Sequence, residues 1–245
     1  KVKGKKEEKF KSILQEAPKG SNTIKTIWKE GAPVDVITSE CNKNYIDLLL
    51  LGALQRENVL KFYLGSIARK LTRKAPCSVF LMIKPSIQYL NPNHMVVNAL
   101  KSNQTEITIN AAFVYAKALN IPNITLVDEI NQSEVAVNVD DDSSLKKATL
   151  RKKELNKEED VRLSEILMGV SKSLISNKNI KSQHIFGTRG YSISHYAKVV
   201  RADILVINSE EKRYYFLRRL FPKDLDYILS ELPTDVLIIK SNQDG

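Results

Sequence analysis

Two small-residue positions after an apolar segment are the part of this sequence best suited to hold a charged ligand. The run 48–51 is followed by Gly52, and Gly65 and Ser66 stand farther along, before a predicted helix over 67–74. Glycines let backbone amides approach an anion, and Ser66 adds a hydroxyl at the positive end of that helix. The spacing therefore predicts a loop of phosphate size between a strand and a helix.

The segments around this loop predict a βαβ unit. Residues 48–51 are continuously apolar, as expected of a parallel strand that is covered on both faces. The predicted helix ends before Pro76, and residues 78–83 are again apolar and partly β-branched. A strand, a helix and a strand in this order favour a right-handed crossover within one sheet.

The same pattern returns 156 positions later in the chain. Three pairs of residues share this offset: Gly31 and Gly187, Asp47 and Asp203, and Lys84 and Lys240. Agreement at three positions without a gap predicts a tandem duplication. We therefore expect two units, residues 1–90 and residues 91–245, the first of which holds only the second half of the repeated design.

Alternating strands and helices predict the fold class. The expected strands of the second unit cover 95–100, 124–130, 180–186, 203–207 and 236–239. Its helices cover 104–119, 193–200 and 217–229, and the last of these is expected to break near Pro222. The charged segment 140–159 reads as a loop that merges into a helix. This order predicts an α/β fold with a doubly wound, Rossmann-like, parallel five-stranded sheet.

The first unit is expected to contain a helix over 5–16, a strand over 23–28 and a helix over 34–42. Its first two strands are missing, and in a sheet of order 3-2-1-4-5 they would lie between the strand over 23–28 and the strand over 48–51. We expect either roughly 65 residues upstream or another chain to fill this gap, because a rearranged unit would leave ladder groups unpaired.

Composition and charge narrow the function classes. The 245 residues are 42% apolar, which excludes wholesale disorder, and no apolar run approaches the ~20 residues of a membrane span. Cys41 and Cys77 lie in different predicted elements, so we expect inert thiols in a reducing cytoplasm. Residues 1–90 carry 17 Lys/Arg against 8 Asp/Glu, within a total net charge of +10. Such a basic unit suits phosphate groups, an anionic membrane surface or an acidic partner, and an ordinary solvated face is the alternative.

At these residues the sequence resembles the universal stress protein family, whose units have a five-stranded, nucleotide-binding-like α/β fold. The ATP-binding branch of that family carries Gly-x2-Gly-x9-Gly-Ser/Thr after its fourth strand, and here Gln55 replaces the second glycine. The resemblance implies that ATP or a related adenine nucleotide binds at six residues: Leu51, Gly52, Gln55, Gly65, Ser66 and Ile67. Because Gln55 adds a side chain where the backbone should approach phosphate, we expect weaker affinity or a reshaped loop. The alternative is a plain glycine turn with a serine helix cap.

The second unit departs further from this motif. Residues 208–211 place Glu210 and Glu211 where phosphate would lie, and no Asp ends the strand over 95–100, so we expect no ATP there. The resemblance implies dimerisation through the fifth strand. The segments 78–83 and 236–239 would then meet as a pseudo-dimer within one chain, and a homodimer is a further alternative.

Segments 62–70 and 221–229 are also similar to the cytoplasmic tails of bacterial cation/proton antiporters and other permeases. That resemblance implies an alternative function, a non-catalytic regulatory module tethered to the inner membrane by a transporter domain upstream in the same chain.

Other chemistry is not expected. Three scattered histidines give no metal site, neither a nucleophile elbow nor a Walker A lysine occurs, and the aromatic residues read as core. We therefore expect no enzyme, no metal and no nucleic-acid partner.

Overall fold

The computed structural model describes residues 4, 8–10, 12, 15, 24–55, 62–83, 91–135, 141–209 and 224–240. The chain divides into two compact units, residues 1–31 and residues 32–245, and each is considered by itself.

In residues 1–31, the described positions 8–10, 12 and 15 are helical, as predicted. The rings of Phe10 and Trp28 meet edge to face, with centroids 6.1 Å apart. The predicted strand over 23–28 is wrong for its described residues, 24–28, which are exposed and form no strand. A single extended segment needs a neighbouring strand for its backbone hydrogen bonds, and this segment has none.

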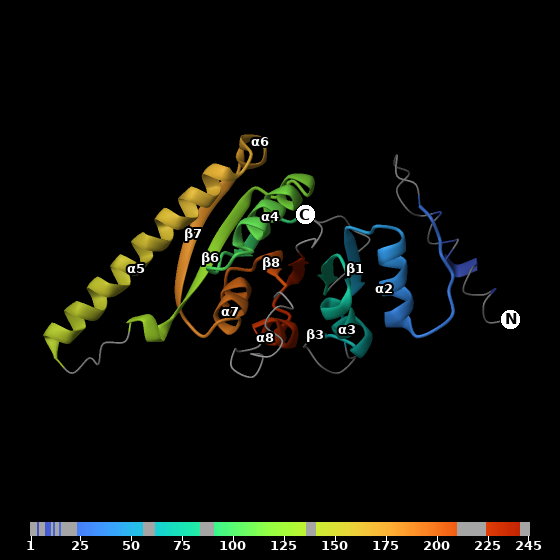
Figure 1. Cartoon of the computed structure of the whole chain (residues 1–245), viewed down its shortest axis with the longest axis horizontal. Helices are drawn as coiled ribbons and strands as arrows, with labels where there is room; N and C mark the ends of the chain where they lie inside the picture. The colour runs from blue at the N-terminus through green and yellow to red at the C-terminus, as the bar shows by residue number, and fades with distance from the viewer. Residues whose placement is uncertain are drawn as a thin grey trace. The chain divides into compact units, whose positions relative to one another are not determined.

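A seven-stranded sheet organises residues 32–245, in the order β1-β4-β9-β8-β5-β6-β7 (Figure 1). Its strands are β1 (Leu48–Gly52), β4 (Ser78–Met82), β5 (His94–Asn98), β6 (Asn123–Asn131), β7 (Asn179–Gly187), β8 (Ile204–Asn208) and β9 (Asp235–Ile239). The strands β7, β6, β5, β8 and β9 are parallel to their neighbours in that series. This is the predicted order 3-2-1-4-5, and the α/β fold class is confirmed.

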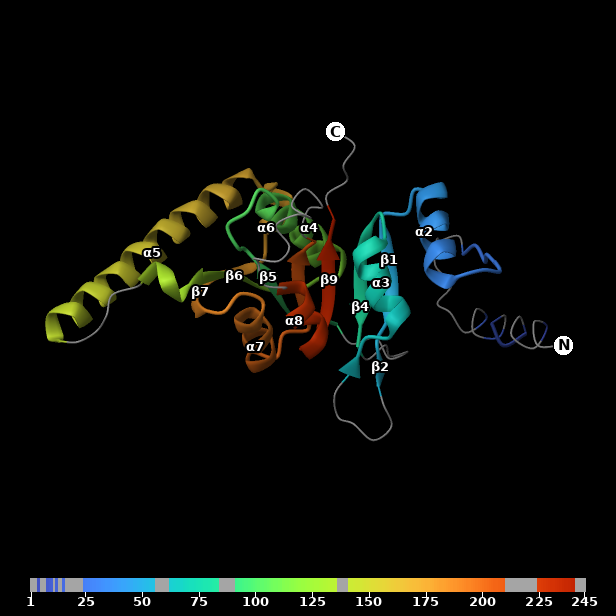
Figure 2. The same ribbon diagram turned by 60° about the horizontal axis from the view of Figure 1, so that its bottom comes forward.

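The strands β4 and β9 join the two predicted units, because they pair antiparallel and lie side by side in the sheet, next to the edge strand β1 (Figure 2). Val79 lies opposite Ile238, and Leu81 lies opposite Val236. These are the two segments for which a meeting within one chain was expected. The division into copies near residue 90 stays a prediction, since one continuous sheet contains strands from both.

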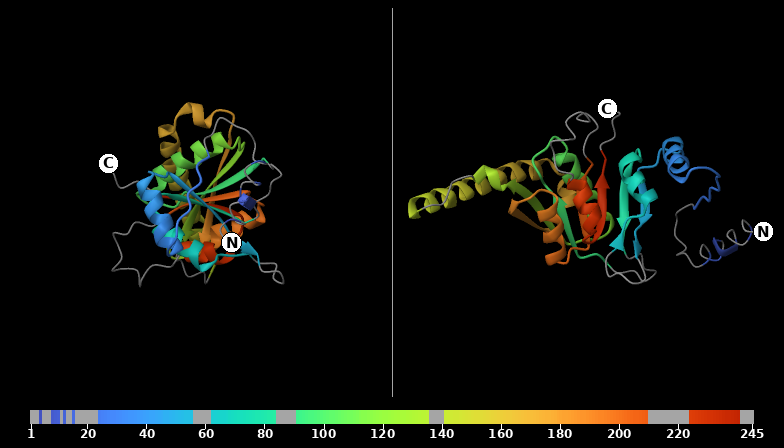
Figure 3. Two further views of the ribbon diagram at one scale, coloured as in Figure 1. Left: turned by 90° about the vertical axis from the view of Figure 1, so that its right-hand side faces the viewer. Right: turned by 90° about the horizontal axis from the view of Figure 1, so that it is seen from below.

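Helices cover both faces of this sheet (Figure 3). One core cluster packs α2 (Pro33–Lys43), α3 (Ser66–Lys74), α7 (Tyr191–Val199) and α8 (Asp224–Glu231) against one face. A second cluster packs α4 (Thr105–Ala118), α5 (Asp142–Gly169) and α6 (Lys172–Ile175) against the other. The predicted break near Pro222 lies outside the described residues.

The charged segment after residue 140 is not a loop, because α5 begins at Asp142 and continues as one helix of 28 residues. Asp141 is the N-cap of this helix. Its carboxylate accepts a 2.7 Å hydrogen bond from the Ser144 amide, and the Ser144 hydroxyl oxygen accepts a hydrogen bond from the Asp141 amide. This reciprocal capping box satisfies amides that a loop would leave to water. The acidic and serine residues at this point therefore mark a helix start.

Candidate functional site

The predicted nucleotide site begins at the carboxyl end of β1. Leu51 and Ala53 pack against the core cluster that contains Leu64, so the strand end and the residue before Gly65 are anchored to the same core. Among the residues that the structure describes, no atom lies within 4 Å of the position that a Cβ on Gly52 would occupy. The backbone at Gly52 is therefore open to close approach by a ligand.

The loop between Gly52 and Gly65 contains a short hairpin that the sequence did not suggest. Strand β2 (Leu54–Gln55) pairs antiparallel with β3 (Phe62–Tyr63), so that Gln55 lies opposite Phe62. Gln55 is the position at which the family motif has its second glycine. In this chain the backbone at Gln55 is instead part of the antiparallel β2–β3 pair. The structure therefore places Gln55 in a hairpin stem at the base of the predicted loop.

The last part of the predicted site is the start of α3. Gly65 is the N-cap in an extended conformation and makes no side-chain cap hydrogen bond, and Ser66 is the first helical residue. Arg69 donates the first helical hydrogen bond to the Gly65 carbonyl, at 2.9 Å, so the amides of 66–68 have no acceptor within the helix. The first turn contains no acidic residue. Ile67 is 45% exposed, so this helix end faces solvent and suits an anion.

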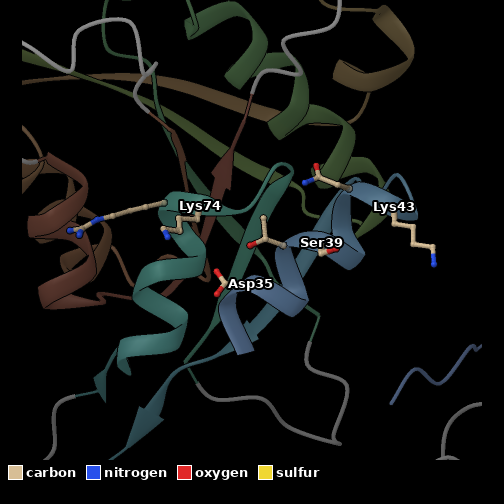
Figure 4. A pocket seen from close by; sticks show the side chains of 7 residues that line it. Asp35, Ser39, Lys43 and Lys74 are labelled. Carbon is tan, nitrogen blue, oxygen red and sulfur yellow. The ribbon is translucent and has the colours of Figure 1, made fainter. Parts of the chain in front are cut away.

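The opposite end of α3 borders a hollow of about 760 Å³ against α2. Figure 4 shows Asp35 and Lys74 on opposite walls of this hollow, with Ser39 beside them and Lys43 pointing away. The hydroxyl of Thr38, which also lines it, is buried and has no hydrogen-bond partner among the described residues. Because Asp35 opposes the lysine, this hollow lacks the uniform positive charge that phosphate needs, and it is separate from the predicted site.

The equivalent crevice of the second unit lies where the strand order reverses, beyond the carboxyl ends of β5 and β8. Polar side chains there form hydrogen bonds within the fold. The side-chain oxygen of Asn98 accepts a 3.0 Å hydrogen bond from the backbone amide of Leu100. The side-chain amide of Asn208 donates a 3.3 Å hydrogen bond to the Ser102 hydroxyl. Each of these two amide side chains thus has a partner within the fold, while the absence of a nucleotide site from this unit stays a prediction.

A buried carboxylate that sequence reasoning missed holds the start of α7. Glu129, in β6, accepts hydrogen bonds from the amides of Gly190 at 2.9 Å and Ile193 at 2.8 Å. Because a side chain already fills this helix end, it offers no free anion site. Its partners are 61 and 64 residues away in the sequence, so no local pattern reveals the role.

A second buried acid lies beside Arg162 on the other side of the sheet. The Arg162 guanidinium donates to the Ala99 carbonyl at 2.7 Å and approaches the Asp128 carboxylate at 3.6 Å. Burial raises the pKa of Asp128 to about 6; Glu159 raises this pKa further, while Arg162 lowers it. We interpret Asp128 as a structural group because it is buried, whereas its neighbour Arg162 lines a hollow at the start of α4.

Cys41 and Cys77 come together although they lie in different elements. Both thiols are free and buried in the same core cluster. Burial raises the pKa of Cys77 to about 11, and the neighbouring Cys41 raises it as well. Both facts agree with the expectation of inert thiols, since a thiol with such a pKa stays protonated at neutral pH.

In the part of the chain that the structure describes, no group of three or more His, Cys, Asp or Glu side chains is placed to hold a metal ion. Likewise, none of the helices in that part of the chain combines the length and apolar character that crossing a bilayer requires.

Known proteins share both sequence and structural features with this chain. The model of the Universal stress protein family matches residues 1–82. A universal stress protein from Archaeoglobus fulgidus DSM 4304 is similar in structure, with a TM-score of 0.65 and 14% identity over 99% of this chain and 78% of that one. A functionally unknown protein from Pseudomonas aeruginosa PAO1 has a TM-score of 0.64 and 14% identity, over 99% and 79%. No curated protein matches the chain. The resemblance to the universal stress protein family is thus confirmed by the family model for residues 1–82. The solved structures, at 14% identity, show that the chain shares their fold.

Proposed function

We propose that this chain is a non-enzymatic, cytoplasmic regulatory module whose first unit binds ATP or a related adenine nucleotide. The observation that carries the proposal is the start of α3, where the amides of residues 66–68 face solvent without an acidic neighbour in the first turn. Such a helix end stabilises phosphate through its unpaired amides and its dipole. Ser66 adds a hydroxyl donor, and Gly52 leaves room for the ligand at the strand end.

The second unit has a different role in this proposal. Its crevice is occupied by its own polar contacts, and its strand β9 pairs with β4 of the first unit. We propose that it acts as a pseudo-partner, which replaces a second nucleotide-binding copy and covers the edge of β4. A change at the nucleotide site of the first unit would then reach the second through the β4–β9 pairing.

Calorimetric titration with ATP, ADP and adenosine tests the proposal. If α3 holds phosphate, ATP and ADP release heat and raise the melting temperature, whereas adenosine binds much more weakly. The rival function is a purely structural interaction module, free or attached to a membrane antiporter. It predicts neither heat nor a shift in melting temperature with any of the three ligands, and that result would reject nucleotide binding.

A further inference from the structure

The first half of α5 carries a basic outer face that the proposed nucleotide site does not use. Lys146, Leu150, Lys153 and Lys157 follow one another at intervals of four, three and four residues, so they lie on one side of the helix. All four are exposed, and Leu150 is 58% exposed. An apolar side chain thus stands among three cations on one surface, which we call the lysine face.

Two other basic side chains of this half-helix are already engaged. Arg151 forms ion pairs with Glu154 at 3.4 Å and Glu158 at 3.8 Å, and the Lys152 ammonium lies 5.4 Å from the centre of the Phe186 ring. Arg151 therefore offsets part of the charge of Glu154 and Glu158. One exposed acid, Asp142, lies four residues before Lys146 on the same side of the helix, and the three lysines outnumber it. Among the residues that the structure describes, the three lysines of the face make no ion pair, and their charges remain available.

The opposite side of the same half-helix is fixed to the fold. Ala148 and Leu155 are buried in a small cluster with Ile130 and Val135, against which Phe186 packs. Figure 1 shows this half of α5 extending past the ends of β6 and β7. The lysine face is therefore held in a fixed orientation, and it points away from the core.

We propose that the lysine face docks on an anionic lipid surface. Lysines near such a surface are attracted to the phosphates and carboxylates of its headgroups, and a leucine among them inserts between the headgroups. A nucleic acid fits less well, because helix α5 contains no aromatic side chain on which a base would stack. This function is independent of nucleotide binding, since the face and the start of α3 lie on different helices.

Vesicle sedimentation with the 245-residue chain tests the proposal. Vesicles of phosphatidylcholine with about one third phosphatidylserine are compared with vesicles of pure phosphatidylcholine, at low and high salt. The chain is expected to sediment with the anionic vesicles only, and to be released by salt, because screening weakens attraction between exposed charges. Equal binding to both kinds of vesicle, or none to either, overturns the proposal.

Two variants with matched charge locate the contact. In K146E/K153E/K157E, vesicle affinity should fall by at least about a hundredfold, since each lysine contributes about fivefold. The control K172E/K181E/K198E changes the net charge equally at exposed lysines outside the face and should retain most of the binding. Leu150→Ser should weaken vesicle binding severalfold. It should not unfold the chain, because Leu150 is exposed. Circular dichroism checks that each variant keeps its helices.

Three outcomes would contradict the proposal. Similar losses in the two triple variants would assign vesicle binding to net charge alone. Unchanged binding of K146E/K153E/K157E would place the contact elsewhere. A dimer in analytical ultracentrifugation that Leu150→Ser dissociates, with no vesicle binding, would identify a second copy of the chain as the occupant.

Discussion

The Asp235 carboxylate accepts a 2.8 Å hydrogen bond from the backbone amide of Ile83, across the antiparallel pair β4–β9. A matching bond runs the other way, from the Lys240 amide to the Ser78 hydroxyl at 3.2 Å. Ser78 and Asp235 are 157 positions apart, and so are Ile83 and Lys240. The two bonds are therefore equivalent under a local twofold axis.

This axis passes through the pair Phe80–Leu237, whose members are also 157 positions apart. Strands β1 and β8 correspond with an offset of 156 instead, since Leu48 pairs with Ser78 and Ile204 pairs with Asp235. The segment that joins β8 to β9 thus contains one more residue than the segment that joins β1 to β4. The predicted equivalence of Lys84 and Lys240 is wrong by one position, because Ile83 is the counterpart of Lys240.

The first prediction concerns Asp235. Asp235→Ala removes the acceptor for the Ile83 amide and should lower the free energy of unfolding by about 1–3 kcal/mol. Burial raises the pKa of Asp235, so its charge is unfavourable in the fold. Asp235→Asn keeps a carbonyl oxygen at the same place without that charge, and should be about as stable as the parent chain at neutral pH. Urea denaturation measures both, and equal losses in the two variants would show that the hydrogen bond is unimportant.

The second prediction is a pH dependence from Asp128. Because its pKa is raised to about 6, the stability that this group contributes is fully present below its unfolded pKa and is lost as the pH rises through 6. The shift corresponds to about 3 kcal/mol at most. Asp128→Asn cannot titrate, so the decline in stability between about pH 4 and pH 7 should become shallower in this variant.

Denaturant midpoints measured across that range check the pH prediction. Asp142→Asn is a matched control, because it makes the same substitution at an exposed acid far from Asp128 in the sequence, at the start of α5. A profile of the same steepness in the parent chain and in Asp128→Asn would mean that other groups dominate the titration.

The α/β core was predictable because its signals are local. Apolar runs such as 48–51 and 203–207 identify buried parallel strands without knowledge of the rest of the fold. The strand predicted from the alternation of residues 24–28 was wrong because a strand also depends on a non-local partner. It needs a neighbouring strand for its hydrogen bonds, and sequence periodicity does not show whether one is present. The start of α5 was misread because Asp and Ser residues favour loops and helix caps alike.

The candidate site was only partly predictable. The motif located Gly52, Gly65 and Ser66, since their order along the chain fixes a strand end and a helix start. It did not reveal the pairing of Gln55 with Phe62, because a two-residue ladder has no periodicity to detect. Nor did it reveal Glu129, whose partners are distant in the sequence. Such contacts depend on the tertiary fold.

The third prediction tests the helix end in the proposed nucleotide site. Ser66→Asp places a carboxylate at the first position of α3, where the helix dipole stabilises it, so the fold should be kept or strengthened. The same charge repels phosphate, and the affinity for ATP should fall by at least about tenfold. Calorimetry measures the affinity, and thermal unfolding provides the control. Unchanged ATP affinity in Ser66→Asp would move the phosphates away from α3.

The fourth prediction separates backbone approach from side-chain contact at β1. Gly52→Ala meets nothing within 4 Å, so the free energy of unfolding should change by less than about 1 kcal/mol. If a ligand approaches the backbone there, the added methyl group should reduce ATP affinity severalfold. A variant that binds ATP as the parent chain does would show that Gly52 is a turn residue without a role in binding.

The fifth prediction concerns Glu129, whose carboxylate binds the backbone amides at the start of α7. Glu129→Ala leaves the buried amides of Gly190 and Ile193 without their acceptor, and each such loss costs about 1–3 kcal/mol. Glu129→Gln keeps one carbonyl oxygen and should be destabilised by less. Hydrogen exchange should locate the damage, with faster exchange at the start of α7 than in α4 on the opposite face of the sheet. If Glu129→Ala instead unfolds no more easily than Glu129→Gln, the amides must find another acceptor, and the α7 terminus would be open to an external anion.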